Sequence, residues 1–202
     1  MSALSDELRF PYDKAPGPGE VKEVVEGLYW ACLPLPFRLN HVNVWLLKNE
    51  DGWTVIDTGC VTKSIKECWE KLFAAPMRGE PVKTLITTHG HVDHIGLAGW
   101  MVDRFGAEFV GTFGEWVWAR LSHSRDVPGS NDEHHRFLLG HGFDEAGADL
   151  MLTSRHRFMD MSSTIPGAIT EIRDGEIVRF GQRDWRAMRL NMRRSTARRT
   201  MC

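Results

Sequence analysis

The 202-residue sequence lacks a long apolar run, a patterned set of cysteines and a strong net charge. Without about 20 consecutive apolar residues, no segment is expected to span a membrane. Residues 1–20 carry charges and prolines where a secretory signal would need an apolar core, which predicts a cytoplasmic location. The formal net charge of −2 gives no reason to expect a nucleic-acid or membrane partner, and the oligomeric state stays open.

The cysteines show no spacing that would indicate a disulfide framework or a zinc–thiolate site. They are Cys32, Cys60, Cys68 and Cys202. We expect reduced thiols, as in most cytosolic proteins, and we expect Cys60 to be a small buried thiol close to the segment 57–59.

The low net charge hides an uneven distribution along the chain. Residues 183–202 contain seven arginines and a single acidic residue, Asp184. The remainder has 18 basic and 26 acidic residues, a formal charge of −8. The sequence therefore predicts a basic, disordered tail at 187–202 on an acidic body. The tail has no aromatic residues interleaved with its arginines, which disfavours a nucleic-acid-binding arm.

The most informative stretch is Thr88–Gly96, which reads THGHVDHIG. Its residues His89, His91, Asp93 and His94 have side chains that bind zinc and similar divalent cations. Because His89, His91 and Asp93 are two residues apart, their side chains can point to one side of an extended loop. The spacing differs from the i, i+4 histidine pair of a helical zinc site, so we expect the ligands on a loop at the end of a strand.

Strand-like and helix-like segments alternate along the chain, which predicts an α/β fold. Strands are expected at 21–33 with a break near Gly27, and at 42–47, 53–56, 82–87 and 107–110, with a hairpin of 169–172 and 177–180. Helices are expected at 62–75, 95–105, 113–121, 132–139 and 145–155. The strands 42–47 and 53–56 are apolar enough to be covered on both faces of a sheet. Residues 1–19 are predicted to form an extended arm and 20–186 the folded domain.

The motif resembles the H-x-H-x-D-H signature of the metallo-β-lactamase superfamily, and the resemblance extends from Asn43 to about Trp185. It implies an αββα sandwich and a hydrolase that uses a metal-activated water on a small-molecule ester, thioester, lactone or related substrate. Two zinc ions would be bound, with iron or manganese as alternatives. His89 and His91 would hold the first ion, and Asp93 and His94 the second. Asp93 would also act in catalysis.

Asp57 follows the predicted strand 53–56 and has two interpretations. It matches the family's strand-end aspartate, which supports the metal-binding histidines through hydrogen bonds. Alternatively, it is a turn residue of Asp-Thr-Gly that bonds to its own backbone. We favour the supporting role over direct metal ligation.

The family pattern breaks after Trp185. The family supplies a third histidine, a bridging aspartate and a last histidine, whereas residues 186–202 contain neither histidine nor aspartate. The histidines His134, His135 and His141 are expected on the surface. The sequence therefore also allows a non-catalytic metal-binding remnant, or an iron-dependent oxidoreductase like a persulfide dioxygenase.

One hypothesis for this break is a shifted reading frame. Back-translation of Leu190–Thr196 with G/C-rich codons contains, in another frame, Gln-His-Ala-Pro-Glu-His, which resembles the family's missing segment. The tail would then be an out-of-frame or truncated end of a longer enzyme, which sequencing of the gene tests directly.

Overall fold

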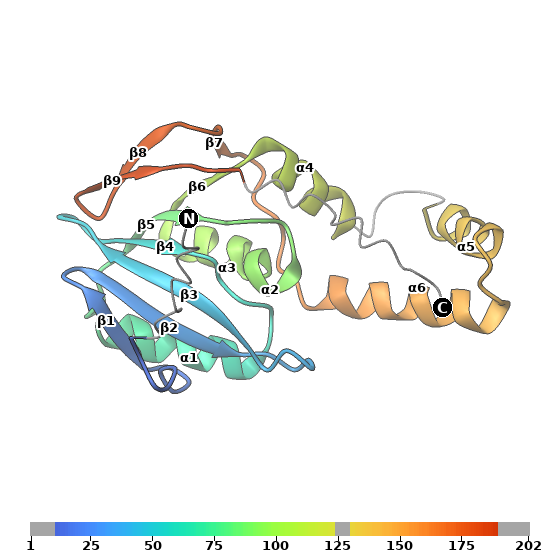
Figure 1. Ribbon diagram of the computed structural model, residues 1–202, viewed down its shortest axis with the longest axis horizontal. Coiled ribbons are helices and arrows are strands. Elements are labelled where there is room, and N and C mark those ends of the chain that lie inside the picture. Colours follow the sequence, from blue (N-terminus) through green and yellow to red (C-terminus); the bar gives the residue numbers. More distant parts are fainter. Residues whose placement is uncertain (1–10, 124–129, 190–202) are drawn as a thin grey trace, which may run out of the picture.

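The structure is a computed structural model that describes residues 11–123 and 130–189. Its strands are β1 Val21–Val25, β2 Leu28–Pro34, β3 His41–Lys48, β4 Trp53–Ile56, β5 Val82–Ile86, β6 Glu108–Gly111, β7 Thr170–Glu171, β8 Ile177–Phe180 and β9 Arg183–Arg186. Its helices are α1 Lys63–Ala74, α2 Val92–Ile95, α3 Ala98–Phe105, α4 Phe113–Ser122, α5 Ser130–Gly140 and α6 Glu145–Asp160 (Figure 1).

The strands β1 to β7 form one mixed sheet in the order of the sequence. Neighbours from β1 to β4 are antiparallel, whereas β4, β5, β6 and β7 run parallel to one another. Parallel neighbours need a crossover connection, and helices occupy all three connections from β4 to β7. The predicted α/β class is confirmed.

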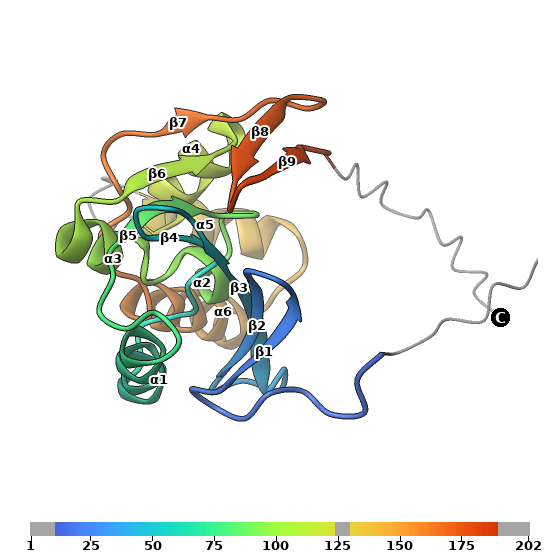
Figure 2. The ribbon, with the colours of Figure 1, turned by 90° about the vertical axis from the view of Figure 1, so that its left-hand side faces the viewer.

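Helix α1 packs on one face of the sheet, together with α3 (Figure 2). It begins where predicted, because the Thr62 hydroxyl caps it by accepting from the Ile65 backbone N–H at 3.2 Å. Its apolar residues recur at helical spacing and are buried: Ile65, Cys68, Trp69, Leu72 and Phe73. The core therefore lies between this helix layer and the sheet.

The helix after the motif begins earlier than the sequence predicts. We expected one helix over 95–105, but α2 starts at Val92 and α3 follows from Ala98. The predicted end is confirmed, since α3 stops at Gly106, whose φ of 64° suits glycine. Asp93 and His94 therefore lie on a helical turn, and residues 88–91 form a bent loop in place of the predicted extended one.

The segment after α6 runs directly over α2 and α3. A Cβ atom on Gly99 would lie 1.9 Å from the Thr164 carbonyl oxygen, so only glycine fits there. Ser163 donates to the Gly96 carbonyl from its backbone N–H at 2.6 Å and from its hydroxyl at 2.8 Å. This segment therefore fixes the far end of the motif.

The predicted hairpin of 169–172 and 177–180 is wrong. The strand β7 joins the main sheet beside β6, and β8 pairs instead with β9 in a separate hairpin. The turn of that hairpin rests on the sheet: the Gly181 N–H donates to the Asn49 side chain at 2.8 Å, and Gly181 packs against Leu47. Local turn residues such as Asp174-Gly175 could not reveal that β7 pairs with a strand 60 residues earlier.

The expectation that two strands are covered on both faces is confirmed for β4, whose Trp53, Thr54 and Val55 are buried, but in β3 it holds only near Leu47. His41 and Asn43 are exposed and Trp45 is half-buried, while Val42, Val44 and Leu46 on the other face are buried. The face that carries His41, Asn43 and Trp45 is covered only in part, by β8 and β9 (Figure 2).

The predicted arm and the predicted tail lie only partly within the described residues. Residues 11–20 contain no helix or strand, and residues 1–10 of the predicted arm lie outside the described part. Of the predicted basic tail, only 187–189 is described, and Ala187 continues the β8–β9 pairing by exchanging backbone hydrogen bonds with Gly175 and Glu176. No described helix is long and apolar enough to cross a membrane.

Candidate metal centre

The motif lies where two parallel strands end. Asp57 follows β4 and Thr88 follows β5 after one intervening residue, so both reach the same edge of the sheet. Asp57 is buried and has a φ of 62°, a conformation that costs a non-glycine residue about 1–2 kcal/mol. Strain of this kind is often retained at functional sites because the surroundings enforce it.

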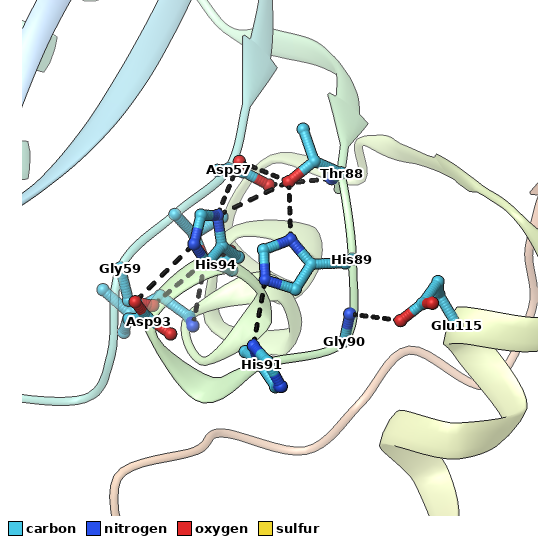
Figure 3. A network of polar contacts seen from close by, with 11 residues as sticks. Asp57, Gly59, Thr88, His89, Gly90, His91, Asp93, His94 and Glu115 are labelled. Carbon is cyan, nitrogen blue, oxygen red and sulfur yellow. Dashed lines mark hydrogen bonds and ion pairs between the residues drawn. The ribbon is translucent and has the colours of Figure 1, made fainter. Parts of the chain in front are cut away.

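The Asp57 carboxylate binds the motif from its buried side (Figure 3). It accepts from the Thr88 backbone N–H at 2.8 Å and from the Thr88 hydroxyl at 2.7 Å. Its Oδ2 also lies 2.8 Å from Nδ1 of His94. Each of these contacts joins residues more than 30 positions apart in the chain. Asp57 therefore binds the motif and not only the backbone of its own turn, as a supporting role requires.

The second nitrogen of His94 faces Asp93. The distance from His94 Nε2 to Asp93 Oδ2 is 3.6 Å. Burial alone would lower the pKa of His94, but the hydrogen bond and charge of Asp57, with the charge of Asp93, outweigh it and raise the pKa above its usual value. Because Asp57 binds Nδ1, Nε2 is the nitrogen left facing the neighbouring carboxylate.

His89 and His91 form a second pair of donors. Nε2 of His89 lies 3.1 Å from Nδ1 of His91, and the Thr88 hydroxyl lies 3.1 Å from the other nitrogen of His89. Burial lowers the pKa of His89, and the neighbouring His94 and His91 act in the same direction. A His89 ring that favours its neutral form is suited to metal binding, since only an unprotonated nitrogen can be a ligand.

The donor atoms fit a metal ion in pairs. With zinc bonds of about 2.0–2.2 Å, one ion can reach two donors that are 3.1 Å or 3.6 Å apart. However, no group of three or more potential ligands converges among the described residues. A tetrahedral site has four ligands, so each pair supplies half of what one ion needs.

Cys60 lies beneath the motif and behaves as predicted. It is fully buried, and burial raises the pKa of its thiol to about 11, with a smaller contribution from the charge of Asp93. A thiol of this kind is inert at neutral pH.

Helix α4 contributes Glu115 and Trp118 to the surroundings of the motif. The Gly90 backbone N–H donates to Glu115 at 2.9 Å (Figure 3). The ring of Trp118 meets the ring of His91 edge-on, with the ring centroids 5.5 Å apart. Burial and the charge of His91 lower the pKa of His123, while a hydrogen bond with the Gly90 backbone opposes them. No spacing in the sequence links these residues to the motif, because α4 reaches it only through the fold.

The three histidines that the sequence places on the surface lie outside the motif. His134 and His135 belong to α5 and His141 follows it directly. Helix α5 lies away from α2 (Figure 1), and His135 is 3.3 Å from Glu145 and 3.4 Å from Asp149 of α6. They therefore do not complete the centre in the described structure.

Comparison with known proteins gives one consistent result. The sequence profile of the metallo-beta-lactamase superfamily matches residues 38–111, which include the whole motif. A beta-lactamase domain protein from Burkholderia ambifaria is 32% identical, with a TM-score of 0.70, over 86% of this chain and 50% of that one. These matches all indicate the metallo-β-lactamase superfamily.

Two further relatives agree with this assignment. A probable metallo-hydrolase, YqjP, from Bacillus subtilis is 36% identical over 66 residues, which are 32% of this chain and 20% of that protein. A metallo-beta-lactamase family protein from Thermus thermophilus, TTHA1429, has the same fold, with 24% identity and a TM-score of 0.67 over 81% of this chain and 52% of its own. The chain thus spans about half the length of the solved superfamily structures it matches.

Proposed function

We propose that this protein is a metal-dependent hydrolase that directs a metal-activated water to an ester, thioester, lactone or related bond of a small molecule. The observation that carries the proposal is the pairwise convergence of the motif's donors, His89 with His91 and Asp93 with His94. Zinc is the metal that these ligands favour, with iron and manganese as alternatives. When bound, zinc would supply a water whose pKa is near 7.

Each motif side chain has a distinct proposed role. His89 and His91 offer one nitrogen each to the first ion, and Asp93 and His94 offer an oxygen and a nitrogen to the second. Asp57 holds Nδ1 of His94, which fixes the ring and directs Nε2 to the metal side. Asp93 orients the attacking water and accepts its proton, as a positioned carboxylate does in general base catalysis.

The paired donors also define the competing proposal. Because each pair is half of a tetrahedral set, a complete site needs donors from outside the described residues. A longer form of the protein, as the frame hypothesis suggests, would provide them. Without them the chain is a metal-binding domain that does not turn over substrate.

The test measures metal content and turnover on the same sample. The full chain is loaded with zinc, manganese or iron, its metal stoichiometry is determined, and it is assayed with a panel of thioesters, lactones, β-lactams and phosphodiesters. Turnover that disappears in Asp93→Asn supports the hydrolase. The matched control is Asp103→Asn, an exposed aspartate of α3, which should retain activity.

Other outcomes contradict the proposal. Metal binding without turnover on any substrate supports the non-catalytic domain. One iron per chain with oxygen uptake in the presence of a persulfide supports the dioxygenase.

A further inference from the structure

Helix α4 holds the backbone of Gly90, the residue between two of the proposed ligands. The Gly90 N–H donates to Oε2 of Glu115 at 2.9 Å (Figure 3). His123, the residue that ends the same helix, contacts the Ser162 hydroxyl at 2.9 Å, and its ring lies 6.1 Å from the Trp118 ring. Gly90 is therefore bound by the first turn of α4.

The helix also leaves no space beside Gly90. A Cβ atom there would lie 2.6 Å from Cε3 of Trp118 and 2.9 Å from the Glu115 carbonyl oxygen. The Trp118 ring also contacts the His91 ring edge-on, with 5.5 Å between the ring centroids and 72° between the ring planes. Loop and helix are thus in direct contact over both the backbone and a proposed ligand.

The helix is itself firmly attached, so it can act as a support. Ala119 is fully buried, and the indole N–H of Trp116 donates to the Pro166 carbonyl at 2.8 Å. Arg120 donates to the carbonyls of Pro166 and Ile165 at 3.2 and 3.4 Å. A displacement of α4 would have to break these bonds as well.

We propose that Glu115 and Trp118 are positioning residues that hold His89 and His91 in the geometry of a shared metal site. The proposal rests on the proposed function, since it concerns the same motif. His89 and His91 flank Gly90, so the orientation of its two peptide groups decides whether their nitrogens meet at 3.1 Å. Glu115 fixes that orientation through the Gly90 N–H, and Trp118 restricts the His91 ring from its outer side.

Because Glu115 acts by accepting a hydrogen bond, a glutamine at this position can replace it. The amide oxygen of Glu115→Gln can still accept from Gly90, whereas Glu115→Ala has no acceptor. Loss of a group that orients a metal ligand typically weakens metal binding about 10–100-fold. We expect Glu115→Ala to weaken Co²⁺ binding about 10-fold, and Glu115→Gln to stay within about 3-fold of the parent. Trp118→Ala should weaken binding, with Trp118→Phe intermediate.

The experiment follows two signals in the full chain: Co²⁺ titration by visible absorption, and hydrogen exchange of the Gly90 amide without metal. Glu115→Ala should lose protection at Gly90 and show a weaker, shifted cobalt spectrum, while Glu115→Gln restores both. Glu133→Ala, which changes an exposed glutamate of α5, is the matched control and should leave both unchanged.

Three results would overturn the proposal. The first is Gly90 protection that survives Glu115→Ala. The second is lost protection with an unchanged cobalt affinity, which would make the contact merely structural. The third is a parent chain that binds no cobalt. A parent that binds cobalt but hydrolyses no substrate would remove the proposed function and leave this inference standing.

Discussion

The inner and outer halves of the metal motif are held by different parts of the chain. The inner half, Asp93–His94, lies on α2 and is bound by the buried Asp57 at the end of a central strand. The outer half, His89–His91, lies in the bent loop before that helix and is bound by the exposed Glu115 of a peripheral helix. The inner half is thus part of the folding core, whereas the outer half depends on contacts that the core does not require. Substitutions that affect the inner half should therefore cost stability and metal affinity together.

The largest effect is expected at Asp57. Its replacement by alanine leaves the Thr88 N–H and the His94 ring without their acceptor, at a cost of about 2–4 kcal/mol in the free energy of unfolding. Metal affinity should also fall about 10–100-fold. Urea denaturation without metal and Co²⁺ titration measure the two effects.

Two further variants separate the backbone from the carboxylate. Asp57→Gly relieves the strained φ of 62° and should recover part of the stability but none of the affinity. Asp57→Asn keeps the shape and tolerates the left-handed conformation. An alanine variant that loses less than about 1 kcal/mol would show that the inner half is not part of the core.

The next effect is expected at Gly90 in the outer half. Gly90→Ala places a methyl group against Trp118 and the Glu115 carbonyl, at 2.6 and 2.9 Å before relaxation. Overpacking of this kind costs about 1–3 kcal/mol, and we expect about 2 kcal/mol in urea denaturation. Gly114→Ala on α4 is the matched control, because its methyl group meets no atom within 4 Å and should be neutral or stabilising. Equal effects at the two glycines would remove the evidence for close contact at Gly90.

The same comparison explains what the sequence could predict. The inner half could be predicted because its residues follow apolar strands and match a dense pattern of metal ligands. Asp57 follows one of those strands directly. The outer half could be predicted only in part. His89 and His91 belong to the motif, but Glu115 is 25 positions from Gly90, on a helix whose packing against the motif cannot be read from its own sequence. Local patterns predicted α1 and the end of α3 at Gly106 well.

Two misses have different causes, one in long-range strand pairing and one in the local pattern of the motif. The strand β7 has two residues and pairs with β6, so no periodicity in its own sequence could show its partner. The start of α2 inside the motif was missed because the alternation of His89, His91 and Asp93 indicates an extended chain up to Asp93.

A smaller effect is expected at Ser163, which tests whether the inner half is also held from its far side. The Ser163 hydroxyl donates to the Gly96 carbonyl at 2.8 Å and accepts from the Trp100 N–H at 3.3 Å. Ser163→Ala should lower the free energy of unfolding by about 1 kcal/mol, because the backbone N–H of Ser163 still binds Gly96. Ser154→Ala, whose hydroxyl bonds within α6, should be near neutral. A cobalt affinity that falls with Ser163→Ala would make this segment part of the site.

The smallest effect is expected at the ion pair of Glu70 and Arg104, which joins α1 to α3 and sets a baseline for contacts outside both halves. The hydrogen bond from Arg104 lowers the pKa of Glu70, although partial burial opposes it. Because the folded-state pKa is the lower one, the pair stabilises the protein above the unfolded-state pKa of about 4.3, and the gain is lost as the pH falls through the folded-state value. Both side chains are substantially exposed, so Glu70→Gln should cost only about 0.5 kcal/mol at pH 7, and the cost should shrink as the pH falls through the folded-state pKa of Glu70. Glu67→Gln, whose partner Lys63 is 3.8 Å away and highly exposed, is the control and should change less. If Glu70→Gln lowered the free energy of unfolding at pH 7 as much as Gly90→Ala, the contact at Gly90 would contribute no more to stability than an ordinary surface ion pair.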